Sequence, residues 1–285
     1  MFAALLLFAV EIDLSSSWIT DADMAKVARN ADLRKLDLSH TTITDTGLEH
    51  LKNLRGVREL SLYYAEYITD DGIAHLRNWK ELEVLSLRGT RVTSKVFEHL
   101  AHLGGLRSLD LGYTQIDDDG FEHLAALTKL ERLAIGGNRL SGASLPLLKL
   151  LSSLRDLDVG GLQRVDSGLW GLALNERNLA RLGELKQLRR LSFALATIND
   201  RGTDRPGHPE AERSALPDLS ALRGLEALEV LDLTRQPVTA EALKSLSALP
   251  KLRELRLGLV KNIDQDALPP VDKIYFNGTW TTPRR

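Results

Sequence analysis

The sequence contains no cysteine and few aromatic residues. The absence of cysteine excludes disulfide bonds, thiolate metal sites and cysteine nucleophiles. Aromatic residues make up only 5% of the 285 residues, although 43% are hydrophobic. Because the apolar content comes almost wholly from leucine, isoleucine, valine and alanine, the composition predicts many small repeated contacts rather than one aromatic-rich core.

Charge of one sign does not accumulate anywhere along the chain. The formal net charge is −2 and the isoelectric point is about 6.4. A protein that binds duplex nucleic acid presents a basic stripe that displaces counterions from the phosphates. The sequence contains no block of basic residues, so we expect no nucleic-acid partner.

Long hydrophobic runs are also missing. The one uninterrupted apolar segment covers residues 1–10, which is too short for a transmembrane helix of about 20 residues. Residues 1–8 are interpreted as an N-terminal cap over the core, or as the remnant of a signal peptide, although no lysine or arginine precedes the run. The compartment, cytoplasmic or exported, stays open at this stage.

A repeat extends along most of the chain. Four consecutive segments begin at Leu33, Val57, Leu82 and Leu106 and read LRKLDLSHTTITDTGLEHLKNL, VRELSLYYAEYITDDGIAHLRNW, LEVLSLRGTRVTSKVFEHLAHL and LRSLDLGYTQIDDDGFEHLAAL. The third apolar position of successive units forms the series Leu14, Leu38, Leu62, Leu87, Leu111, Ile135, Val159, Phe193, Leu233, Leu257 and Phe276. The first seven members are 24 or 25 residues apart, and such spacing indicates tandem repetition.

Each unit contains two hydrophobic periods. The alternating L-x-L half predicts a short strand, because every second side chain then points to the same face. The second half places Leu48, Leu51 and Leu54 on one helical face, and Thr44 with Asp45 provides a cap and an acidic first turn. One unit cannot bury its own apolar face, so we expect a solenoid of eleven strands, with a concave parallel sheet and convex helices.

The motifs L-x-x-L-x-L-x-x-T/N-x-I and T-D-x-G-L resemble the leucine-rich-repeat family. The repeat is similar to the bacterial 24-residue type and to F-box-associated repeats. The resemblance implies an α/β horseshoe that holds a protein or peptide. We expect one domain over residues 1–285, with a C-terminal cap at 271–285.

The repeat spacing widens twice, to 34 residues before Phe193 and to 40 residues before Leu233. These positions predict insertions at residues 162–173 and 199–215. The second insertion is polar and rich in turn residues, so we expect a mobile loop there. Both insertions follow a strand and precede a helix, which predicts that they lie on the same edge of the solenoid.

Histidines occupy one phase of four consecutive units, at His50, His75, His99 and His123. Their positions beside core leucines predict that they point outward from the convex helices. Helices pack about 8–10 Å apart, which is too far for two imidazoles to share one ion without help. We therefore expect a solvated repeat consensus, without a metal or any other cofactor.

The concave face is predicted to carry two columns of side chains. The first contains Asp13, Asp37, Ser61, Ser86, Asp110, Ala134, Asp158, Ser192, Asp232, Arg256 and Tyr275. The second contains Glu11, Lys35, Glu59, Val84, Ser108, Arg132, Asp156, Arg190, Val230, Glu254 and Lys273. The aspartates suggest an acidic groove, but charges of alternating sign on strands about 4.8 Å apart can also pair within the sheet. Self-neutralising ladders are the favoured interpretation.

Most of the tyrosines, and one tryptophan, gather after the strands of units one, three and five. The candidates for partner binding are Trp18, Tyr63, Tyr64, Tyr67 and Tyr113, with Arg88, Asp37 and Asp110 beside them. Exposed tyrosine and tryptophan are typical interface anchors. The alternative is that these rings pack against neighbouring units.

Catalysis has no comparable support, since no phosphate loop, G-x-S-x-G or H-E-x-x-H motif is present. We therefore expect a non-catalytic, monomeric scaffold that binds a protein or peptide through the concave face and the strand-to-helix edge. Two alternatives are a structural or envelope-associated domain of a longer protein and a substrate-recruiting module of a ligase complex. A hydrolase ranks third.

Overall fold

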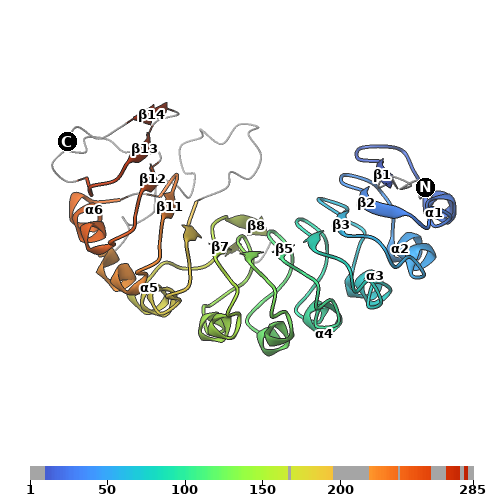
Figure 1. Ribbon diagram of the computed structural model, residues 1–285, viewed down its shortest axis with the longest axis horizontal. Helices are drawn as coiled ribbons and strands as arrows, with labels where there is room; N and C mark the ends of the chain where they lie inside the picture. Colours follow the sequence, from blue (N-terminus) through green and yellow to red (C-terminus); the bar gives the residue numbers. More distant parts are fainter. Residues whose placement is uncertain are drawn as a thin grey trace, which may run out of the picture.

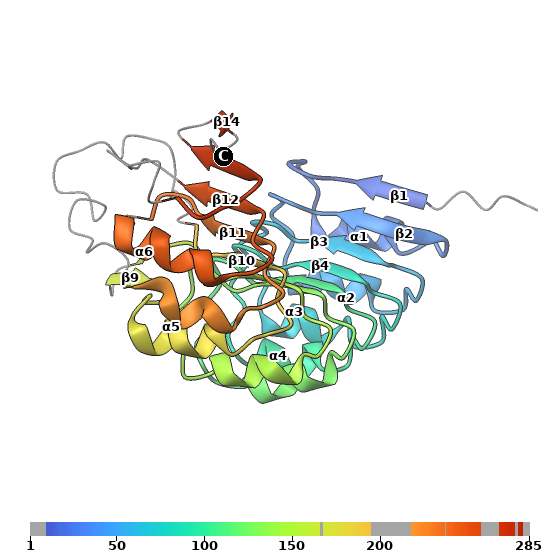
Figure 2. The same cartoon turned by 60° about the vertical axis from the view of Figure 1, so that its left-hand side comes forward.

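The computed structural model describes residues 10–165, 168–194, 218–236, 238–257, 268–276 and 279–281. These residues form a curved solenoid, with strands along its inner face and helices along its outer face (Figure 1). The same division between a concave sheet and convex helices is seen after rotation (Figure 2). The repeats predicted from the sequence therefore stack side by side in chain order.

The inner face is one sheet in which eleven strands are parallel, as predicted. In chain order they are β1 (Val10–Asp13), β2 (Leu33–Asp37), β3 (Glu59–Ser61), β4 (Val84–Ser86), β5 (Ser108–Asp110), β6 (Arg132–Ala134), β7 (Asp156–Asp158), β10 (Arg190–Ser192), β11 (Val230–Leu233), β12 (Glu254–Leu257) and β13 (Lys273–Phe276). A twelfth strand, β14 (Thr279–Thr281), pairs antiparallel with β13 and was not predicted. We number the repeats one to eleven by the parallel strands.

The strand register agrees with both predicted columns. Lys35 lies opposite Glu11 and Glu59, and Asp37 lies opposite Asp13 and Ser61. The register is determined by burial, because a shift of one residue would turn every core leucine towards water. Strand β7 pairs directly with β10, so the insertion between them leaves the ladder intact.

The outer face contains short α-helices and 3₁₀ helices rather than α-helices throughout. The α-helices are α1 (Asp21–Val27), α2 (Asp45–Leu51), α3 (Asp70–Ala74), α4 (Val96–Leu100), α5 (Glu176–Gly183) and α6 (Ala240–Ser245). The 3₁₀ helices are η1 (Phe121–Ala126), η2 (Leu145–Leu150), η4 (Leu219–Gly224) and η5 (Leu246–Ala248). Apolar residues three positions apart, such as Leu219, Leu222 and Leu225, are all buried, and this spacing matches the three-residue turn of a 3₁₀ helix.

The core is one continuous layer between the sheet and the helices, extending from Met24 to Ile274. The inner repeats contribute strand and helix residues, mostly leucines, that are almost fully buried, such as Leu109 in β5 and Leu124 in η1 of repeat five. Larger rings fill the middle of the layer, where Phe97 and Phe121 meet edge to face with centroids 4.9 Å apart. Stability therefore comes from contacts between neighbouring repeats.

Aspartates at the helix starts link the first four repeats through hydrogen bonds. The Asp21 carboxylate accepts hydrogen bonds from the N–H of Thr44 at 2.8 Å and from its hydroxyl at 2.7 Å. Asp45 accepts the same pair from Thr69, and Asp70 accepts it from Thr93. Thr44 and Thr69 thus bind the preceding repeat and also cap their own helices.

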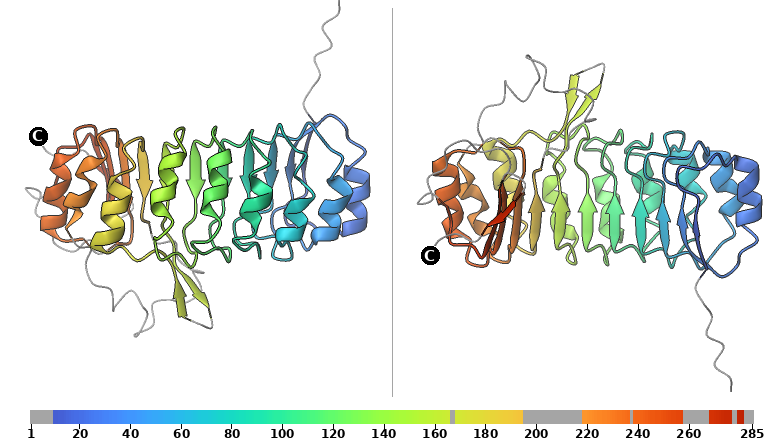
Figure 3. Two further views of the ribbon diagram at one scale, coloured as in Figure 1. Left: turned by 90° about the horizontal axis from the view of Figure 1, so that it is seen from below. Right: turned by 90° about the horizontal axis from the view of Figure 1, so that it is seen from above.

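The insertion at residues 162–173 contains a β-hairpin of β8 (Gln163–Val165) and β9 (Gly168–Trp170). It projects from the edge of the solenoid at which strand β7 ends (Figure 3). The predicted cap at 1–8 and the predicted loop at 199–215 lie outside the described residues. In the described part of the chain, no helix is both long and apolar enough to cross a membrane.

Candidate functional site

The loops that follow the strands form a rim along the concave face, and this rim has a regular backbone. The second residue after the last strand leucine has a positive φ in repeat after repeat. These residues are Ser16, His40, Tyr64, Gly89, Tyr113, Gly137, Gly161 and Arg235. Glycine is favoured there, and a left-handed conformation costs another residue roughly 1–2 kcal/mol. An imidazole and two phenol rings are therefore held at positions where the backbone favours glycine.

Three rings meet in repeats two and three. His40 stacks on Tyr64, with centroids 5.7 Å apart and an interplanar angle of 7°. Tyr63 stands edge-on to both, at 5.2 Å from His40 and 4.8 Å from Tyr64. Tyr63 remains 37% exposed, while the Tyr64 ring lies against the backbone of Gly89. We call His40, Tyr63 and Tyr64 the ring cluster.

Beside the ring cluster, Arg88 lies over the ring of Tyr113, 4.5 Å from its centroid. Its Nη1 atom is 3.4 Å from Oδ1 of Asp110. A Cβ at Gly112 would lie 2.4 Å from the same nitrogen, so this glycine makes room for the guanidinium. Burial alone would lower the pKa of Arg88, but Asp110 and the other neighbours outweigh it and raise the pKa above its ordinary value.

Of the two alternatives open for Tyr113, an exposed anchor or a ring packed against neighbouring units, the structure has the packed one. It is only 8% exposed, because its ring lies against Gly137 and its hydroxyl lies close to Gly161. Burial raises the pKa of this hydroxyl, which is hydrogen-bonded with the backbone of Leu162. Tyr113 therefore packs against the next two repeats and holds the base of the hairpin.

The other candidate rings lie in the same row of loops but are not part of this packing. Trp18, between β1 and α1, is 96% exposed. Tyr67, between β3 and α3, is 50% exposed, with Arg91 at 5.5 Å from its ring centroid. Among the described contacts, neither ring touches the ring cluster.

His40, Arg139, Trp170 and Asp117 also lie at the rim and were not among the residues predicted from the sequence. His40 completes the ring cluster, and it could have been found by aligning the residues two positions after each strand. Arg139 lies 5.8 Å from the Trp170 ring centroid and pairs with Asp117 at 2.9 Å. No sequence signal places the hairpin over Arg139, because that contact depends on how the insertion folds.

The concave columns contain the predicted pairs of opposite charge. Lys35 pairs with Glu59 at 3.2 Å, and two further pairs, Arg190–Asp156 and Arg256–Asp232, lie at 3.3 and 3.6 Å. The aspartates also have a backbone role, since the Asp37 carboxylate accepts the N–H of Ser39 at 2.9 Å. Much of the acidic column therefore stabilises the sheet and its turns.

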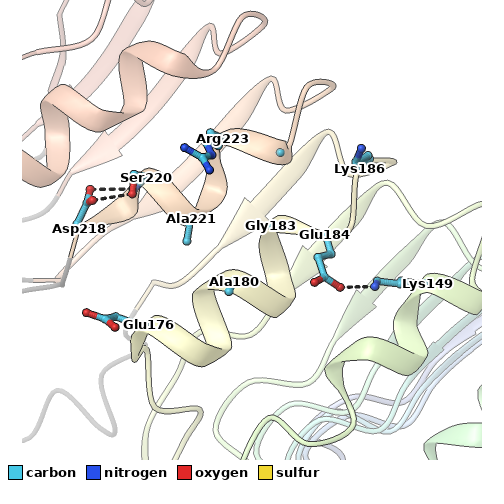
Figure 4. Close-up of a pocket in the computed structure, with 11 residues that line it drawn as sticks. Lys149, Glu176, Ala180, Gly183, Glu184, Lys186, Asp218, Ser220, Ala221 and Arg223 are labelled. Atoms are coloured by element: carbon cyan, nitrogen blue, oxygen red, sulfur yellow. Dashed lines mark hydrogen bonds and ion pairs between the residues drawn. The ribbon is translucent and has the colours of Figure 1, made fainter.

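The convex face offers weaker candidates. A shallow hollow of about 820 Å³ lies between α5 and η4, where Lys149 pairs with Glu184 and the Ser220 hydroxyl donates to Asp218 (Figure 4). Charges of both signs line it without converging on one point. In the described part of the chain, no three histidine or carboxylate side chains are grouped to hold a metal, and the histidines of the convex column are single side chains on successive repeats.

Comparison with known proteins agrees with the architecture. A family described as "Leucine-rich repeat region" matches residues 19–279. No curated protein gives a significant match to the sequence.

Three solved structures of bacterial proteins are similar to this chain, and the first of them shares the fold. An internalin from Listeria monocytogenes is 23% identical with a TM-score of 0.58, over 88% of this chain and 68% of its own. Internalin C2 from the same organism is 21% identical with a TM-score of 0.47, over 87% of this chain and 80% of its own. A leucine-rich-repeat protein of Leptospira interrogans is 20% identical with a TM-score of 0.45, over 82% and 68%. At these identities, the likeness concerns the fold alone.

Proposed function

Because the chain belongs to the leucine-rich-repeat family, whose fold is typical of protein-binding scaffolds, we propose that it binds a protein or peptide at the rim of its concave face. The contact surface combines the ring cluster with Arg88 and Asp110 and continues across the sheet to Asp37. In this proposal, the chain is one non-catalytic repeat domain that acts as a monomer and needs no cofactor.

The ring cluster is the observation that carries the proposal. Tyr63 leaves more than a third of its surface in water, in a chain with only 5% aromatic residues. Apolar rings gathered at a rim favour a binding surface, and tyrosine and arginine are enriched among residues that dominate binding energies.

The rim is also held rigidly. Tyr64 lies against the backbone of Gly89, and Tyr113 supports Arg88 from below. A side chain fixed by its neighbours loses little conformational entropy when a partner binds. Tyr63 rests on the Tyr64 ring and Arg88 on the Tyr113 ring, and this support favours both side chains as anchors.

Site-specific photocrosslinking tests the proposal. A benzoylphenylalanine introduced at Tyr63 is expected to capture one defined partner from a lysate of the source organism. The same crosslinker at Glu122, an exposed residue of the convex face, serves as the matched control. Capture should be competed by unlabelled protein, and its Tyr63→Ala variant should need a several-fold higher concentration for the same competition. Equal capture from Glu122, or no capture from Tyr63, would overturn the assignment of the rim.

A further inference from the structure

Repeat five shows how this rim binds an arginine. Arg88 lies over the ring of Tyr113, and its Nη1 atom is 3.4 Å from Oδ1 of Asp110. That carboxylate is oriented by the N–H of Gly112, which donates to it at 2.8 Å. Tyr113 has φ 55°, and its ring lies between the Arg88 guanidinium and the backbone of Gly137. The Asp110 carboxylate and the Tyr113 ring, three residues apart in one turn, thus hold the Arg88 guanidinium.

Repeat two has the same frame. The N–H of Ser39 donates to Oδ1 of Asp37 at 2.9 Å, and the Ser39 hydroxyl donates to the same oxygen, which leaves Oδ2 for a further donor. His40 has φ 55°. Here the residue equivalent to Arg88 is Ser15, which is too short to reach the carboxylate or the ring. His40 is exposed, and it stacks on Tyr64 at 5.7 Å. Repeat two therefore presents the Asp37 carboxylate and the His40 ring, but no arginine stands at the position equivalent to Arg88.

The charges around this frame favour a cation. Asp13 and Asp37 lie in register on adjacent strands, about 4.8 Å apart, where like charges destabilise each other. Lys35 forms its ion pair with Glu59 at 3.2 Å, and its charge attracts Asp13 and Asp37 only from a greater distance. Among the described residues, no cationic group is within ion-pair distance of Asp13 or Asp37. A guanidinium would relieve this repulsion and supply the missing ion pair.

We propose that repeats one and two bind an arginine side chain of the partner, with its guanidinium stacked on His40 and paired with Asp37. The inference rests on the proposed function, because it names one contact of that partner. Arginine suits the frame, since its planar group stacks on a ring while its N–H fork meets a carboxylate. Repeat two has Ser39 where repeat five has Gly112, so the partner's guanidinium approaches from the concave side rather than along the rim.

The test uses the whole chain and the peptide acetyl-Gly-Gly-Arg-Gly-Gly-amide. Backbone amide shifts in NMR should change around Ser15, Asp37 and His40 and should saturate with peptide concentration. The citrulline peptide, which lacks the charge, should produce no such change. Asp37→Asn retains the turn acceptor and should weaken arginine binding at least fivefold. Glu98→Gln, which removes a carboxylate from the convex face, should leave binding unchanged.

A second variant mimics repeat five directly. Ser15→Arg with Ser39→Gly places an arginine and a glycine as in Arg88 and Gly112, so the protein's own guanidinium should block the peptide. Thr42→Arg adds the same charge at a nearby exposed loop and should leave the affinity within twofold. Equal binding of citrulline, no effect of Asp37→Asn, or full binding to the double variant would overturn the inference. Such a failure would leave capture at Tyr63 unaffected, so the two proposals are tested separately.

Discussion

A Cβ atom at Gly72 would lie 2.3 Å from Oδ1 of Asp45, in the preceding helix. The same carboxylate accepts the Thr69 N–H at 2.9 Å and the Thr69 hydroxyl at 2.6 Å. Each letter of the T-D-x-G motif thus has a role between repeats. Threonine caps one helix, aspartate binds the next threonine, and glycine leaves room for the preceding aspartate.

Gly72→Ala should destabilise the protein through this contact. We expect a loss of about 1–3 kcal/mol in the free energy of unfolding, in the range of a disrupted cap or an overpacked site. Urea denaturation of Gly72→Ala, Asp45→Ala and the double variant measures the coupling between the residues. The glycine substitution should cost clearly less in the Asp45→Ala background. Gly104→Ala is the control, because a Cβ there has no neighbour within 4 Å.

Tyr63→Ala and Tyr113→Ala should differ in stability. Tyr113 is 8% exposed and packs on two glycines, so its truncation should cost about 2–4 kcal/mol, as for a buried ring. Tyr63 is 37% exposed, and its truncation should cost less than about 1 kcal/mol. Thermal unfolding measures both. Equal losses would mean that Tyr63 is a packing residue rather than an available anchor.

The strand register predicts which leucines hold the repeats together. Leu109 is 1% exposed in strand β5, so Leu109→Ala should cost about 2–5 kcal/mol. Ser108, its neighbour on the concave face, can be changed to alanine as a control with little effect expected. Chemical denaturation that shows a loss below about 0.5 kcal/mol for Leu109→Ala would contradict the observed core.

The stability effects of Asp158→Asn and Asp117→Asn should have opposite signs at neutral pH. Burial raises the pKa of Asp158 above its ordinary value of 3.8, so the folded state favours its protonated form. That contribution is lost as the pH rises through the folded pKa, and Asp158→Asn should gain stability relative to the wild type towards neutral pH.

Hydrogen bonding by the Ser94 hydroxyl, against a smaller effect of burial, lowers the pKa of Asp117. Asp117→Asn should therefore lose stability at neutral pH, and the loss should shrink as the pH falls. Denaturation at several pH values checks both slopes.

The fold could be predicted from the sequence because the pattern of each repeat determines its own strand and core positions. The columns through Asp37 and Lys35 were placed correctly, since alternation leaves only one register that buries the leucines. The site could be predicted only in part. Tyr113 is buried because Gly137 and Gly161 lie one and two repeats further along, and no local pattern reports that contact.

The same limit applies to the insertions and the outer face. The length of the segment at 162–173 located an insertion, but not the hairpin of β8 and β9. Periodicity located the helices, but the choice between α and 3₁₀ geometry depends on packing against neighbouring repeats. His40 was overlooked because its position is distinctive only when the left-handed residues of all repeats are compared.

The most direct test is the affinity of the captured partner for rim and convex variants. Calorimetric titration should show that Tyr63→Ala weakens binding about five- to thirtyfold, as for an interface anchor that contributes about 1–2 kcal/mol. Glu122→Ala, on the convex face, should bind like the wild type. Loss of affinity in Glu122→Ala, with full affinity in Tyr63→Ala, would contradict the assignment of the concave rim as the binding surface.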